Sequence, residues 1–172
     1  MPFPETKTEA SGIISILEEH PYFRVVKSIP DGMSKQIEAA VIDFIKTSHL
    51  PKGIDVGGFY QQTLSAIANS TYLGGGGDFW LGIKDGKVVT YVMAFIGKDI
   101  DHRMSYTVTQ AWVRKDYRGN PVVKEWWEQI RQRAKDLFCG HLVITSSRNP
   151  MAYKRFLGHG MSEYAVLLKE TF

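Results

Sequence analysis

The chain has 172 residues, 44% of them hydrophobic and 12% aromatic, which is enough to fill the core of one domain of ordinary size. Its 21 basic and 18 acidic residues leave a formal charge of +3, too even a balance to indicate a nucleic-acid or membrane protein. The single cysteine, Cys139, excludes an internal disulfide and a thiolate metal cluster, so we expect a soluble cytoplasmic protein. We expect residues 1–10 to be flexible and residues 11–172 to form one domain.

The first half of the chain predicts helices around one strand. A short helix is expected at residues 13–17, followed by a strand at 23–29 that Pro30-Asp31 ends. Apolar residues then recur at helical spacing over 37–45 and again over 59–71, which predicts two amphipathic helices. Gly74–Gly77 lacks the lysine and the serine or threonine of a phosphate-binding loop, so we interpret it as a flexible turn.

From residue 79 the pattern predicts an antiparallel meander and then a crossover. Strands are expected at 79–83 and 88–96 around the Asp85-Gly86 turn, with a third at 105–113. A helix over 123–137 with Trp127 on its apolar stripe, and Trp126 exposed beside it, leads to a strand at 141–145. A strand, helix and strand of this length imply parallel pairing. A helix opened by Asn149-Pro150 and a strand at 164–168 complete an α/β (α+β) fold with a mixed sheet.

That order, with Val113-Arg-Lys-Asp-Tyr-Arg-Gly119 between strand and helix, resembles the GNAT superfamily of acyl-CoA-dependent N-acyltransferases over residues 22–170. The resemblance implies a Q/R-x-x-G-x-G/A loop whose backbone N–H groups and helix dipole hold the CoA pyrophosphate. Pro121 and Val123 stand at the two later family glycines, which removes an N–H and the room for close approach. Basic residues still surround the loop, namely Arg114, Lys115, Arg118 and Lys124.

A late segment carries the second resemblance. Residues 149–161 are similar to the family's N-x-x-A-x-x-x-Y-x-x-x-G-F motif, in which the tyrosine often protonates the departing thiolate. Phe156 stands at that tyrosine and has no proton to give. Tyr153, one turn earlier, is either a replacement acid or a packed aromatic, and Asn149 is either a helix cap or a ligand contact.

The resemblance implies acetyl-CoA as cosubstrate, in a notch where residues 111–113 splay away from 141–145. Main-chain donors near Trp112 and Val113 would stabilise the oxyanion, and Tyr153 is the candidate catalytic acid in place of the family tyrosine. The implied cofactor-binding residues are Ala111, Trp112, Val113, Arg118, Gly119, Asn120, Val122, Val123, Asn149, Ala152 and Phe156.

The general base is open, because residues 105–113 contain no acid. The nearby candidates are Asp78, Asp99, Asp101 and His102, for which solvated turn residues are the simpler interpretation. The five histidines show no metal-ligand spacing, so no metal is expected, and Cys139 is interpreted as a small buried residue.

Two main functions follow. The leading one is transfer of an acetyl group from acetyl-CoA to an amine. The alternative is a catalytically degenerate GNAT-fold binding or structural protein, possibly viral, that meets a protein partner through an exposed Trp126. A third possibility is transfer of the acyl group onto a nucleobase or another unusual acceptor, and only the basic residues near Arg118 support it.

Overall fold

The computed structural model describes residues 22–48, 50–72 and 74–145. The helix expected at 13–17, the helix from Asn149 and the strand at 164–168 lie outside these residues. The described elements run in the order β1 (Tyr22–Val25), α2 (Ser34–Thr47), α3 (Val56–Tyr72), β2 (Gly77–Lys84), β3 (Lys87–Lys98), β4 (Met104–Val113), the 3₁₀ turn η1 (Lys115–Tyr117), α4 (Val122–Asp136) and β5 (His141–Ile144).

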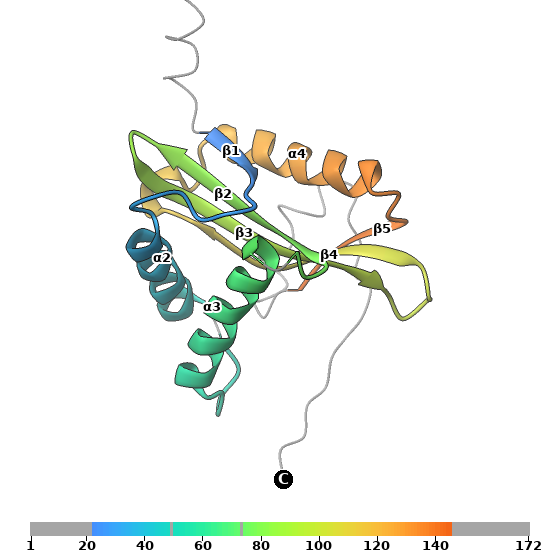
Figure 1. The fold of residues 1–172 in the computed structure, drawn as a ribbon, viewed down its shortest axis with the longest axis horizontal. Coiled ribbons are helices and arrows are strands. Elements are labelled where there is room, and N and C mark those ends of the chain that lie inside the picture. Colours follow the sequence, from blue (N-terminus) through green and yellow to red (C-terminus); the bar gives the residue numbers. More distant parts are fainter. Residues whose placement is uncertain (1–21, 49, 73, 146–172) are drawn as a thin grey trace, which may run out of the picture.

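The strands form one mixed sheet in the order β1-β2-β3-β4-β5 (Figure 1). The first four strands pair antiparallel, and β5 pairs parallel with β4 after the chain has crossed through α4. Asp85 and Gly86 both have positive φ in the two-residue loop between β2 and β3, which is the geometry that suits the twist of a hairpin. The expected meander and parallel unit are therefore confirmed.

The sheet lies between two helical layers. Helices α2 and α3 cover one face and α4 covers the other (Figure 1). Val41, Phe79 and Tyr91 belong to the core under α2 and α3, whereas Tyr106 and Ile130 belong to the core under α4. Because β3 is covered on both sides, it is buried almost continuously rather than in alternation. Among the described helices, none is both long and apolar enough to cross a membrane.

A β-bulge at Thr109 changes which way β4 faces. Met93 of β3 pairs with Gln110 and the next residue, Ala94, pairs with Val108, so Thr109 is the extra residue. Val108 packs under α4, and strict alternation would put Trp112 on the same face. Instead Trp112 packs under α2 and stacks on Tyr91 at 6.0 Å. The bulge therefore reverses which side chains of β4 face each helical layer after Thr109.

The two adjacent tryptophans of α4 contradict one prediction. Trp126 is 4% exposed and packs between Phe23 and Tyr117, whose rings lie 5.4 and 6.2 Å away. Trp127 is the partly exposed neighbour. The buried stripe of the helix is Val122, Trp126, Ile130 and Ala134, one residue out of phase with the predicted stripe at its start. The exposed Trp126 on which a partner surface was expected is therefore a core residue.

Candidate functional site

Within the residues that the structure describes, β5 pairs with β4 only as far as Val108, so the end of β4 presents a main-chain edge. The ladder between the two strands ends at the pair of Val108 and Ile144, with one further bond from the Thr145 N–H to the Val108 carbonyl. Beyond the bulge, the Arg114 N–H donates to β3, so the peptide groups of Ala111 and Val113 point the opposite way. This edge, from Ala111 to Val113, is called the open edge below. The sequence predicts a cofactor notch at these residues, and that assignment stays a prediction.

The loop that follows the open edge departs from an anion cradle in its hydrogen bonding. Pro121 has no N–H, and the Val122 N–H donates to the side-chain oxygen of Asn120 at 3.0 Å. The N–H groups of Val123 and Lys124 donate to the carbonyls of Asn120 and Pro121, at 3.1 and 3.0 Å. The first turn of α4 thus has its donors engaged by the chain itself. A phosphate at this point must rely on side chains.

Gly119 is required by the backbone of this loop rather than by a close neighbour. Its φ is +86°, a conformation that other residues adopt only with strain, and a Cβ at this position would meet nothing within 4 Å. The turn it makes lets Asn120 reach the helix start, where it acts as the cap. Val122, also predicted at the cofactor site, is 7% exposed and belongs to the core under α4.

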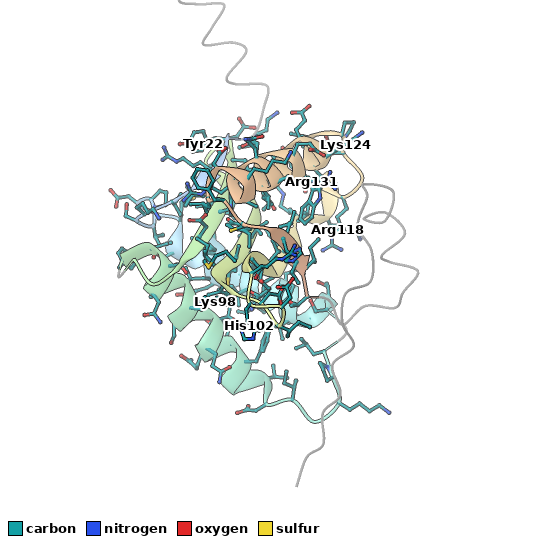
Figure 2. All side chains as sticks on the ribbon, turned by 90° about the vertical axis from the view of Figure 1, so that its right-hand side faces the viewer. Tyr22, Lys98, His102, Arg118, Lys124 and Arg131 are labelled. Atoms are coloured by element: carbon teal, nitrogen blue, oxygen red, sulfur yellow. The ribbon has the colours of Figure 1, made fainter. Side chains whose placement is uncertain are left out.

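Arg118 lies against the open edge. Its Nε donates to the Val113 carbonyl at 2.9 Å, and its Nη2 lies 3.5 Å from Oδ2 of Asp43 on α2. The indole N–H of Trp112 donates to the same Asp43 oxygen at 2.7 Å. Lys124, in the first turn of α4, lies on the same side of the molecule as Arg118 (Figure 2). Trp112 itself is 7% exposed, and its indole anchors Asp43 while its main chain faces β3, where its carbonyl accepts the Thr90 hydroxyl.

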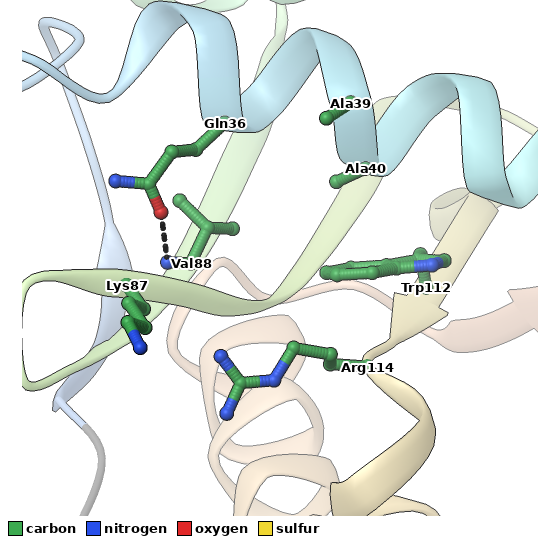
Figure 3. Close-up of a pocket in the computed structure, with 7 residues that line it drawn as sticks. All are labelled: Gln36, Ala39, Ala40, Lys87, Val88, Trp112 and Arg114. Carbon is green, nitrogen blue, oxygen red and sulfur yellow. Dashed lines mark hydrogen bonds between the residues drawn. The ribbon is translucent and has the colours of Figure 1, made fainter.

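A groove of about 250 Å³ lies between α2 and the end of β4 (Figure 3). Its floor is apolar, and the side chain of Gln36 closes one end by bonding the Val88 N–H at 2.9 Å and the Gly86 carbonyl at 3.0 Å. Lys87 and Arg114 supply positive charge at its rim, although Arg114 pairs with Asp116 at 2.7 Å. The lining residues are Gln36, Ala39, Ala40, Lys87, Val88, Trp112 and Arg114.

Asp78 is not the solvated turn residue that the sequence suggested. It is 2% exposed and accepts hydrogen bonds from the Tyr106 hydroxyl at 2.9 Å and from Arg133 at 2.8 and 3.2 Å. The indole N–H of Trp80 donates in turn to the Tyr106 hydroxyl at 2.7 Å. This network ties β2 and β4 to α4. It makes Asp78 a structural anion rather than a base.

The other turn candidates lie in the connection from β3 to β4. Asp101 and His102 are exposed, and Asp101 contacts His141 of β5 at 2.7 Å. A backbone N–H from Arg103 and the contact with His141 lower the pKa of Asp101. Asp99 is partly buried and one of its oxygens accepts the Ile100 N–H. These groups lie at the end of β4 where Met104 begins, so the structure does not bring them to the open edge.

Two further groups are held in their neutral forms. Burial, and to a lesser extent the charge of Asp43, raises the pKa of Tyr91 above its ordinary value. Burial also raises the pKa of the Cys139 thiol, which argues against a thiolate nucleophile. Among the residues that the structure describes, no three His, Cys, Asp or Glu side chains gather as metal ligands would.

The glycine run is a hydrogen-bonded turn. Gly74 and Gly76 have φ of +63° and +66°, and the N–H groups of Gly75 and Gly76 donate to the carbonyls of Asn69 and Gly74. These donors are used in joining α3 to β2, so the segment is no phosphate cradle.

The structure thus brings Arg118 to the Val113 carbonyl at the open edge, while Gly119 and Asn120 form the turn from Arg118 into α4. Val123 is partly buried at the start of α4. The predicted Asn149, Ala152, Tyr153 and Phe156 lie outside the described residues. Sequence reasoning missed Asp43, and the signal was a charged residue on the inner side of α2, one turn after Ala40.

Comparison with solved structures places the fold. A possible acetyltransferase from Clostridium difficile 630 superposes with a TM-score of 0.66 at 14% identity, covering 89% of this chain and 97% of that one. Glucosamine-6-phosphate N-acetyltransferase from Arabidopsis thaliana gives 0.59 at 13% identity, covering 88% and 98%. A predicted acetyltransferase with acetyl-CoA from Clostridium acetobutylicum gives 0.62 at 10% identity, covering 88% and 96%.

No protein-family model and no curated protein matches the sequence. At identities of 10 to 14% these likenesses show the fold, which is that of the GNAT acetyltransferases.

Proposed function

We propose that this GNAT-fold protein is an N-acyltransferase that transfers an acetyl group from acetyl-CoA to an amine. One observation carries the proposal: in the described part of the chain the β4–β5 ladder ends at Val108, and beyond the bulge at Thr109 the peptide groups of Ala111 and Val113 face away from β3. An extended substrate arm can pair with such an edge as another strand would.

In this proposal one N–H group of the open edge acts on the reacting carbonyl. Acetyl-CoA supplies the activated acyl group. The N–H group of either Ala111 or Val113 would donate to its carbonyl oxygen, where negative charge grows as the amine attacks, and the other would pair with the extended arm of the ligand. The new C–N bond forms, the C–S bond breaks, the amine nitrogen gives up a proton and the departing thiolate gains one. Tyr153 is the proposed donor to the thiolate, as a replacement for the family tyrosine, at whose position this chain has Phe156.

The phosphates would be held by charge rather than by the helix start. The first-turn donors of α4 are engaged internally, so the guanidinium of Arg118 and the ammonium groups of Lys115 and Lys124 would carry this part of the binding. Binding of this kind weakens with salt more than binding by main-chain donors. Arg118→Ala is therefore expected to weaken acetyl-CoA binding most at low salt.

The engaged donors at the start of α4 also favour a second candidate function, that of a binding protein. A helix start whose donors are all engaged suits a protein that has lost the cofactor site and uses the fold for binding alone. The two candidates differ in whether acetyl-CoA binds at all.

The test is a thermal-shift titration with acetyl-CoA followed by thiol release in the presence of a panel of amines. A ligand that binds the native state raises the melting temperature in proportion to the logarithm of its concentration. The proposal expects such a rise and amine-dependent release of CoA. Tyr153→Phe should then lower turnover by about 10²- to 10⁴-fold without changing the affinity. Absence of any shift would favour the binding protein.

A further inference from the structure

The guanidinium of Arg118 is already paired with an anion, the carboxylate of Asp43. This guanidinium donates to the Val113 carbonyl and lies 3.5 Å from the Asp43 carboxylate. The Val113 carbonyl points outward from the open edge, and the Asp43 carboxylate lies next to it through their shared contact with Arg118. A phosphate that needs Arg118 would meet a side chain committed elsewhere. Asp43 therefore stands where a competing ligand anion would stand.

Of the two partners, Asp43 is the anchored one. It receives the indole N–H of Trp112 at 2.7 Å, and Trp112 is buried under α2. The two side chains are about equally accessible, 44% for Arg118 and 47% for Asp43, so the bonds and not the exposure distinguish them. The long side chain of Arg118 can reorient at low cost, whereas Asp43 can move only by breaking its hydrogen bond with the Trp112 indole.

Carboxylates and phosphates are alternative partners for a guanidinium, since both accept two parallel N–H bonds. We propose that Asp43 is a positioning residue that holds Arg118 at the open edge until a diphosphate takes over the guanidinium. The inference rests on the proposed function for the identity of the diphosphate, which is that of CoA. An exposed ion pair of this type is worth little, so the exchange costs a modest fraction of the affinity.

The first experiment compares Asp43→Asn with Glu38→Gln. The asparagine oxygen still accepts the Trp112 N–H, so the change removes the charge and keeps the anchor. Glu38 lies on the exposed side of the same helix, which makes Glu38→Gln a matched loss of one charge. Asp43→Asn is expected to tighten binding of acetyl-CoA and of inorganic pyrophosphate by about two- to fivefold. Glu38→Gln should change both by less than this.

The second experiment separates the diphosphate from the rest of the ligand. S-acetyl-pantetheine has no diphosphate, so its affinity should not change in Asp43→Asn. In an Arg118→Ala background the same substitution should give no gain, because the guanidinium for which Asp43 and the diphosphate compete is gone. Melting temperatures of all variants establish that each is folded, and Asp43→Ser replaces Asp43→Asn if the latter is not.

The outcomes distinguish the two proposals. If acetyl-CoA binds and turns over with an affinity that Asp43→Asn leaves unchanged or weakens, the role of Asp43 is wrong and the acyltransferase stands. A gain that Glu38→Gln reproduces, or a loss of turnover at unchanged affinity, also overturns it, the latter in favour of a general base. If pyrophosphate binding tightens while no variant binds acetyl-CoA, the Asp43 role stands and the acyltransferase falls. Failure of both anions to bind any variant overturns both.

Discussion

Replacing Asp78 by alanine should destabilise the fold by about 3 kcal/mol, and the contacts of its carboxylate give the magnitude. The two bonds from Arg133 are charge-assisted, and such bonds contribute about 1.5 to 3 kcal/mol. The Tyr106 hydroxyl loses its acceptor in a buried site, at about 1 kcal/mol. Breaking a fully buried pair costs about 3 to 5 kcal/mol, but Arg133 is 34% exposed and regains water, so the lower end is expected.

The assay is urea unfolding followed by fluorescence, with the free energy of unfolding extrapolated to water. Asp78→Asn serves as the control, because it keeps the volume and one acceptor and should cost less than the alanine. The m-value should stay constant if the change acts on the folded state alone. A loss below about 1 kcal/mol for Asp78→Ala would refute the reasoning, since the network would then contribute no more than a surface ion pair.

Three further predictions concern the fold and its ends. In the same urea assay, Trp126→Ala should lower the free energy of unfolding by about 3 to 5 kcal/mol, because Trp126 is buried, and Trp127→Ala by less than half of that. Equal losses would contradict the burial of Trp126 rather than Trp127 on α4. Gly119→Ala should cost about 1 kcal/mol through its positive φ alone, since a Cβ there meets open space; a neutral result would mean that the loop adopts another conformation. The pKa of Asp101 is lower in the folded protein than its ordinary value of 3.8, so the ionised carboxylate stabilises the fold above pH 3.8. This contribution is lost as the pH falls through the folded-state pKa. The difference in melting temperature between Asp101→Asn and the wild type should therefore be present at neutral pH and shrink in acid.

The sheet could be predicted because its signals are local. Asp85-Gly86 marks a hairpin by itself, and the alternation on either side needs no distant partner. The loop at Gly119 and Asn120 was located by the resemblance of a short run of neighbouring residues to the cofactor loop of the family.

The bulge at Thr109 could not be predicted, because a threonine in a β-rich run carries no mark of an extra residue. Its consequence is large, since it decides that Trp112 lies under α2. Trp126 and Trp127 are adjacent on α4, so either one could belong to the apolar face that the helix buries. Only the packing of the folded protein decides that it is Trp126.

Asp43 was missed, and Asp78 was wrongly interpreted as a solvated turn residue, because their partners are distant along the chain. Asp43 meets Trp112 across 69 residues, and Asp78 meets Arg133 across 55. No local pattern contains such a contact. A charged residue on a helix face or at a strand start suggests solvent until its partner is known.

The central claim is that acetyl-CoA lies along the open edge of β4, and amide chemical shifts in a titration of the isotope-labelled protein test it most directly. Ala111 and Val113 have outward N–H groups, whereas those of Gln110 and Trp112 face β3 and serve as internal controls. The account predicts that acetyl-CoA shifts the Ala111 and Val113 amides strongly and the two controls weakly. Saturation of the protein with no change at Ala111 and Val113, or no binding at all, would contradict it.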